Sequence, residues 1–158
     1  MVQLEKTDDE LASNTLELFS ELPEILGMIA NLHTAYNKNF EKSYEIFSEI
    51  VGRYQEQSHL LDPHLDNIIN LLLAPIREST TPVDMKHAAF KYLYQLSKVR
   101  TFKGIIKFLP HEICDFDFVL NLTEQQDVAD AEHWETRYVL LLWLSMLILN
   151  PFQLSRLD

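Results

Sequence analysis

The amino-acid sequence predicts an all-α protein built from stacked helices. Hydrophobic residues recur at the three- and four-residue spacing of one helix face, and no segment shows the strict alternation of a strand. Only three glycines and six prolines interrupt the 158 residues. Hydrophobic residues make up 47% of the chain, and a chain of this length buries about 68–70% of its unfolded surface. A sizeable helical core is therefore expected.

The N-terminal third contains three amphipathic segments. Pro23 ends or kinks the first segment and can open the second as its first helical residue. The expected buried stripes are Leu11, Thr15, Leu18 and Leu22, then Ile25, Ile29, Leu32 and Tyr36, and finally Phe40, Tyr44, Phe47, Val51 and Tyr54. Each stripe predicts one helix that packs on a neighbour.

Capping residues predict where the next two helices begin. Asp62 precedes Pro63 and is expected to cap one helix, while Thr81-Pro82-Val83-Asp84 has the form of a capping box for another. Pro75 should kink the first of these helices because it removes one backbone hydrogen bond. The two stripes are Leu65, Ile68, Ile69, Leu72 and Ile76, and Met85, Ala88, Ala89, Tyr92, Leu93, Leu96 and Val99.

The C-terminal third predicts two further helices. Gly104 is the expected stop of the preceding helix. Pro110 is expected to open a helix carrying Ile113, Phe116 and Leu120, and the polar residues 121–132 form a loop. A last helix should run from about His133 to Leu149. Glu135 suits the positive end of its dipole, and a structural role is expected for Glu135 and Arg137.

These elements add up to about seven helices with short connections. Some helix pairs recur about forty residues apart, near the period of HEAT and armadillo repeats. The sequence thus favours a HEAT/armadillo-like helical repeat array, although a compact helical bundle would show the same stripes.

Composition excludes several classes of protein. A single cysteine, Cys114, rules out a disulfide framework and a cysteine-rich zinc site. The first ten residues are polar and acidic, unlike a signal peptide, and the apolar run Tyr138–Leu149 is too short to cross a bilayer. We therefore expect a cytoplasmic protein without membrane insertion. The net charge of −11 disfavours nucleic acid as a partner.

Charge is concentrated in blocks. Residues 112–135 hold eight acids and no Lys or Arg, whereas residues 86–107 hold six Lys or Arg and no acid. Aromatic residues interleave the basic block, a pattern also found on nucleic-acid surfaces, but an amphipathic helix with solvated lysines is favoured. A third interpretation is a cationic ridge for an acidic protein partner. The candidate partner-binding residues are Lys91, Lys98, Arg100, Lys103 and Lys107.

No constellation predicts catalysis or a cofactor. His111-Glu112 resembles half of a zinc-protease motif, but the second histidine position is Asp115. Acids beside Cys114 disfavour its thiolate, so a buried and inert thiol is expected. Asp115 and Asp117 should point to different sides of a helix. The six scattered histidines show no ligand spacing, and no glycine-rich phosphate loop exists. The chain is expected to be neither an enzyme nor a metal protein.

Three stretches resemble the tubulin-specific chaperone D family, also called tubulin-folding cofactor D. The first is YQEQSHLLDPHL at residues 54–65, although Ser58 replaces an expected proline. The second comprises Lys98–Arg100 and FLPHE at residues 108–112. The third comprises WETRY at 134–138, LLLWLS at 140–145, Pro151-Phe152 and SRLD at 155–158. Residues 1–50 match only in helical character.

The resemblance implies that residues 1–158 form one N-terminal helical-repeat segment of a longer solenoid. It implies capture of β-tubulin, cooperation with tubulin cofactors C and E, and binding of an Arf-like small GTPase. With those cofactors the family assembles or dismantles the α/β-tubulin dimer and promotes GTP hydrolysis by tubulin. The alternative is a repeat scaffold with another client. Because the last helix is apolar all around, the isolated chain is expected to aggregate or to depend on a partner.

Overall fold

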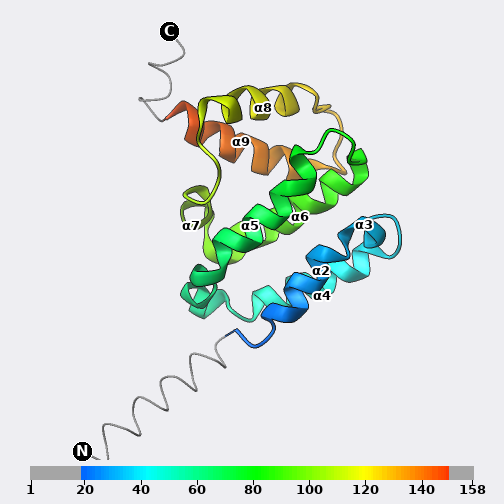
Figure 1. Ribbon diagram of the computed structural model, residues 1–158, viewed down its shortest axis with the longest axis vertical. Helices are drawn as coiled ribbons and strands as arrows, with labels where there is room; N and C mark the ends of the chain where they lie inside the picture. The colour runs from blue at the N-terminus through cyan, green and yellow to red at the C-terminus, as the bar shows by residue number, and fades with distance from the viewer. Residues whose placement is uncertain (1–18, 150–158) are drawn as a thin grey trace, which may run out of the picture.

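The computed structural model describes residues 19–149, and within that range the chain is helical throughout with no strand. Residues 19–149 form eight α-helices, and a 3-10 helix, η1, precedes α5; Figure 1 shows their arrangement. Their bounds are α2 Leu22–Ala30, α3 Leu32–Ala35, α4 Phe40–Gly52, η1 Gln55–Leu61, α5 Asp62–Arg77, α6 Val83–Arg100, α7 Phe102–Ile106, α8 Ile113–Glu124 and α9 Trp134–Ile148. The expected helix carrying Leu11, Thr15 and Leu18 lies outside the described residues.

The helices form stacked pairs. Helix α4 packs on α6 and α6 packs on α9, so these three form one layer. In the second layer α2 contacts α5, and Arg77 of α5 forms an ion pair with Asp115 of α8. Each helix of one layer packs on its partner in the other, as α2 with α4, α5 with α6 and α8 with α9 (Figure 1). This arrangement confirms the predicted repeat array.

The core is centred on α6, which contacts helices of both layers. Tyr92 is fully buried, and its ring stacks on that of Phe47 in α4 with 4.1 Å between centroids. The predicted stripe of α6 is confirmed from Ala88 to Val99. Fully burying an apolar side chain such as Leu93 stabilises the fold by about 1.5–3 kcal/mol. The predicted stripe of α5 is buried throughout, from Leu65 to Ile76. In the two stripes before it, the aliphatic residues and Phe47 are buried, whereas Tyr36, Phe40, Tyr44 and Tyr54 are partly buried and pack against the core.

Both predicted N-terminal caps are wrong. Asp62 is the first residue of α5, and its carboxylate does not cap that helix because η1 runs directly into α5. Helix α6 follows Pro82, and neither partner of the expected Thr81–Asp84 box makes a side-chain cap there. The capping box that forms is at α8. There the Glu112 N–H donates to Asp115 Oδ2 over 2.9 Å, and the Glu112 side chain accepts from the Asp115 backbone.

Gly104 does not end α6. The helix ends at Arg100 because Thr101 adopts φ 75° and ψ 154°, and Gly104 lies inside α7. A Cβ on Gly104 would come within 2.8 Å of Arg100 Cγ, so glycine provides room for the arginine side chain. The predicted helix stop at Gly104 is therefore wrong, and the glycine is needed because the Arg100 side chain packs against its backbone.

The segment after α7 also differs in its boundaries. Helix α8 begins at Ile113 rather than at Pro110, and it continues to Glu124, so the expected loop 121–132 is helical in its first four residues. Helix α9 matches the predicted last helix closely. Its buried residues include Trp143, whose indole N–H donates to the Pro110 carbonyl oxygen over 2.7 Å. That bond holds the start of the α8 segment against α9.

Candidate protein-docking surface

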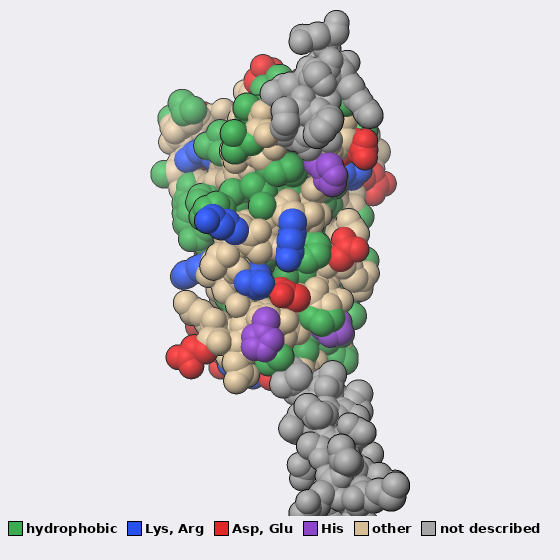
Figure 2. All heavy atoms as spheres, turned by 90° about the vertical axis from the view of Figure 1, so that its left-hand side faces the viewer, with side chains coloured by type: hydrophobic (Ala, Val, Ile, Leu, Met, Phe, Trp, Pro, Cys, Tyr) green, Lys and Arg blue, Asp and Glu red, His purple; other side chains and the backbone are tan. Residues whose placement is uncertain are grey.

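The five candidate basic residues lie on α6, on α7 and directly after α7. Three of them, Lys98, Lys103 and Lys107, are exposed. Figure 2 views the molecule from the α7 side and shows Lys and Arg side chains gathered beside hydrophobic ones. The structure therefore leaves these three lysine side chains exposed on this surface, with Lys107 Nζ 5.1 Å from the Phe108 ring centroid. We call Lys91, Lys98, Arg100, Lys103 and Lys107 the basic ridge.

Unlike the exposed Lys98, Lys103 and Lys107, Lys91 packs against aromatic side chains of α4. Its side chain is half-buried, and Nζ lies 5.8 Å from the ring centroids of both Phe40 and Tyr44 in α4. The attraction between a cation and the quadrupole of an aromatic ring stabilises such a contact by about 0.5–1 kcal/mol at exposed sites. Lys91 therefore contributes to the packing of α4 on α6 as well as to the charge of the ridge.

Arg100 is bound within the chain. Its Nε donates to Asp62 Oδ1 over 2.6 Å, and its second terminal nitrogen donates to Asp62 Oδ2 over 3.1 Å. The guanidinium holds the pKa of the Asp62 carboxyl below its usual value, although partial burial opposes the effect. The ion pair joins the end of α6 to the start of α5 and supports the chain reversal at Thr101.

An aromatic surface between α6 and α9 escaped the sequence analysis. Tyr94 of α6 meets Trp134 and Tyr138 of α9 edge to face, with centroid separations of 4.8 and 5.3 Å. Trp134 and Tyr138 remain 43% and 41% exposed. The available signal was the spacing of Trp134, Tyr138 and Leu141, which places them on one side of α9. Because α9 carries apolar residues on every side, this spacing does not distinguish an exposed aromatic face from a buried one.

An apolar groove adjoins this surface. It has a volume of about 350 Å³ and is lined by Phe102 of α7 with Tyr138, Leu141 and Leu142 of α9. Phe102 and Leu141 are 47% and 55% exposed. Large apolar side chains clustered in one exposed place mark interaction sites more often than scattered ones do. We call these four residues the α7–α9 groove.

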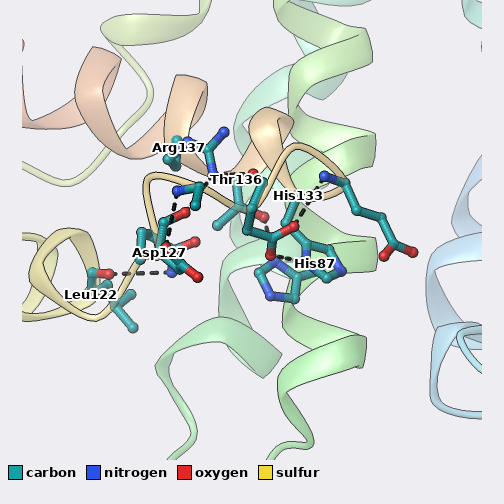
Figure 3. A network of polar contacts seen from close by, with 10 residues as sticks. His87, Leu122, Asp127, His133, Thr136 and Arg137 are labelled. Carbon is teal, nitrogen blue, oxygen red and sulfur yellow. Dashed lines mark hydrogen bonds and ion pairs between the residues drawn. The ribbon is translucent and has the colours of Figure 1, made fainter.

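A polar network closes the loop before α9 (Figure 3). The His87 and His133 rings stack with 3.8 Å between centroids, and His87 Nδ1 lies 2.7 Å from Thr136 Oγ1. His133 Nδ1 lies 2.5 Å from Asp130 Oδ2, and Arg137 donates to the carbonyl oxygens of Asp127 and Asp130. Burial and then the neighbouring His133 lower the pKa of His87.

This network assigns Arg137 to loop support, as expected, and accounts for two of the six histidines. Glu135 is in the first turn of α9, as predicted, but it is buried, and its Oε2 has no hydrogen-bond partner among the described residues.

The expected burial of Cys114 is wrong. Its thiol is exposed, because α8 directs Asp115 and Val119 inward and Cys114 outward. Asp115 is buried and Asp117 is exposed, so the two carboxylates diverge as predicted. Between Phe19 and Leu149, no group of three His, Cys, Asp or Glu side chains is placed to hold a metal ion. No helix of that same range has the length and hydropathy to span a membrane.

The paired layers and the exposed aromatic and basic surface define a helical-repeat protein of the armadillo type. The family model for the ARM repeat of tubulin-specific chaperone D-like proteins matches residues 51–158, and the chain belongs to that family. It is similar to the tubulin-specific chaperone D of Dictyostelium discoideum, with 25% identity over 222 aligned positions. The alignment covers 87% of this chain but only 15% of that relative. No solved structure matches the chain.

Proposed function

We propose that this chain is a non-enzymatic module of a tubulin-folding cofactor and that it binds β-tubulin. The observation that carries the proposal is the family match over residues 51–158, which includes every helix from η1 to α9. Stacked helical repeats present extended surfaces suited to holding a folded client. In this proposal residues 1–158 form one N-terminal repeat segment of a longer cytoplasmic, cytoskeleton-associated solenoid.

The wider activity extends beyond this segment. We propose that the module takes part in assembly and disassembly of the α/β-tubulin dimer, and in activation of GTP hydrolysis by tubulin. Tubulin cofactors C and E and an Arf-like small GTPase are the proposed partners. The chain spans about 15% of its curated relative, so other repeats would supply the remaining contacts.

The basic ridge is the proposed contact for an acidic client. Lys98, Lys103 and Lys107 supply exposed charge, whereas Lys91 and Arg100 hold the ridge in place through Phe40, Tyr44 and Asp62. Opposite charges at the rim of an interface accelerate association and make it sensitive to salt. Binding should therefore weaken as ionic strength rises.

A matched charge-reversal pair tests this proposal. Lys98→Glu with Lys103→Glu should weaken capture of purified β-tubulin by about tenfold or more, mainly through the association rate. Lys38→Glu with Lys42→Glu makes the same charge change on exposed lysines of the α3–α4 region and should have little effect. If the Lys98→Glu, Lys103→Glu variant captures β-tubulin as well as the unmodified chain does, the basic ridge is not part of the interface. A pull-down in which the unmodified chain retains another client and no tubulin would favour a scaffold role instead.

A further inference from the structure

We propose that the α7–α9 groove binds an acidic protein segment that inserts a leucine or phenylalanine anchor between Phe102 and Leu141. The inference deepens the proposed function and rests on it only in taking a protein as the partner. The groove is a shallow, open apolar site with a volume of about 350 Å³, which is enough for one or two anchoring side chains.

The walls of the groove are held rigidly before any partner arrives. Tyr138 packs edge to face on Tyr94, and the turn after it places Leu140 and Trp143 in the core. Trp143 is also hydrogen-bonded to the Pro110 carbonyl. Because these walls need little reordering on binding, less of the interaction energy is lost to entropy.

The opposite wall is equally well supported. Helix α7 buries Ile105, and Gly104 packs against Arg100, which Asp62 holds. Phe102 is thereby presented at the start of α7 with 47% of its surface exposed. An exposed phenylalanine on a fixed backbone is a ready contact for a partner's apolar side chain.

The charged residues near the groove indicate which kind of segment would bind there. Lys98 lies one turn beyond Tyr94 on the same side of α6, and Lys103 follows Phe102 directly. Residues 86–107 and 136–149, which together contribute the groove and its border, contain no Asp or Glu. Figure 2 shows Lys and Arg side chains beside hydrophobic ones on the α7 face, with an acidic side chain among them. Asp62 is an acid at the basic ridge, and its charge is paired with Arg100, so Lys98 and Lys103 keep the surroundings of the groove basic. An apolar site beside exposed lysines fits an acidic segment with apolar anchors.

Nucleic acid would be a different occupant of the same border. Lysines beside aromatic rings also suit single-stranded nucleic acid, which stacks its bases on aromatic faces. The net charge of −11 and the eight acids of residues 112–135 oppose a long polyanion. An acidic protein segment needs only the local basic border and the groove.

The test uses a fluorescein-labelled peptide that carries leucine and phenylalanine among glutamates. Binding to the whole chain is followed by fluorescence anisotropy. Leu141→Glu should weaken binding by about tenfold or more, because it places a charge in the apolar site. Leu71→Glu is the matched control, since Leu71 is 42% exposed on α5 in the other layer and should change binding less than about twofold. Circular dichroism and melting temperature confirm that both variants remain folded.

Altered probes separate the contributions. Replacing the peptide's apolar anchors by serine, or its glutamates by lysine, should each abolish most of the binding. Equal binding of the serine peptide, or tighter binding of a single-stranded oligonucleotide, would overturn the proposal. So would a Leu141→Glu variant whose only change is dissociation of an oligomer, because the groove would then be a contact between copies. Peptide binding without capture of β-tubulin would contradict the proposed function and leave this inference supported.

Discussion

Arg100 holds Asp62 through two hydrogen bonds of 2.6 and 3.1 Å, across the junction where η1, α5, α6 and α7 meet. The sequence predicts separate roles for these residues, a helix cap for Asp62 and a place on a partner-binding surface for Arg100. In the structure they form one bidentate ion pair. It sets the direction in which the chain leaves α6, and through α7 it supports one wall of the proposed groove.

Asp62→Asn should destabilise the chain by about 1 kcal/mol, because it weakens a bidentate, partly exposed ion pair. The corresponding change in melting temperature is about 2–4 °C for a chain of this size. Since Arg100 lowers the folded-state pKa of Asp62, this contribution is present above the ordinary carboxyl pKa of about 4 and is lost as the pH falls from there through the lowered folded-state pKa. Urea unfolding near neutral pH measures the effect. Asp117→Asn, at an exposed carboxylate of α8, should have almost no effect.

Thr101→Gly should stabilise the protein. Thr101 has φ 75° and ψ 154°, a conformation that strains a β-branched residue by about 1–3 kcal/mol and that glycine adopts freely. Part of that gain is offset by the greater freedom of glycine in the unfolded chain, which leaves about 1 kcal/mol. Asn39→Gly, at φ 55° and ψ 34°, is the comparison and should gain less, because asparagine tolerates that region. A lower melting temperature for Thr101→Gly would contradict the strained backbone.

Asp115→Ala should cost about 1–2 kcal/mol. The substitution removes the capping box of α8 and the 2.8 Å ion pair to Arg77, which links two helices of one layer. Most of the cost comes from the cap, because the Arg77 side chain is 46% exposed and water replaces its partner. Asp117→Ala on the same helix lies outside both interactions and is the matched control. Equal unfolding midpoints for the two variants would show that the cap does not stabilise α8.

Stability should decrease as the pH falls below about 6.5, where the unfolded chain protonates its histidines. The pKa of His87 is lowered in the folded chain by burial and by His133, so the unfolded state gains the proton first. Lys91 adds to this effect, whereas Asp84 and Asp130 oppose it. His87→Gln should flatten the pH dependence of urea unfolding between about pH 7.5 and about pH 5.5. His111→Gln, at an exposed histidine of the α7–α8 segment, is the comparison, and an equal flattening by both variants would exclude the stacked pair as its source.

Much of the fold was predictable because helix periodicity is a local property. The stripes from Ile25 to Val99 were predicted from spacing alone, and they became the core. Helix boundaries were less predictable. A glycine at position 104 is consistent both with a helix end and with a close approach of another side chain. Only the position of the Arg100 side chain in the folded protein shows that the second case applies.

The candidate site was predictable only in part. The lysines of the basic ridge were visible as a charge block, and three of them are exposed. The aromatic contacts of Tyr94 with Trp134 and Tyr138 join residues forty or more positions apart, so no local pattern indicates them. Cys114 was misplaced for a similar reason. Its exposure depends on which face of α8 turns toward Arg77 and α9, and neither is near it in the sequence.

By itself the sequence determined the helical class and the absence of a recognisable catalytic motif, because hydrophobic spacing and residue content can be read locally along the chain. The stacked pairs were decided by the packing of the helices, since a compact bundle would show the same hydrophobic stripes. The tertiary structure decided which charges are paired and which are free, and it brought Phe102 and Leu141 together into a groove. The physical reason is that ion pairs, burial and concave surfaces depend on distances between segments, and those distances exist only once the helices have packed.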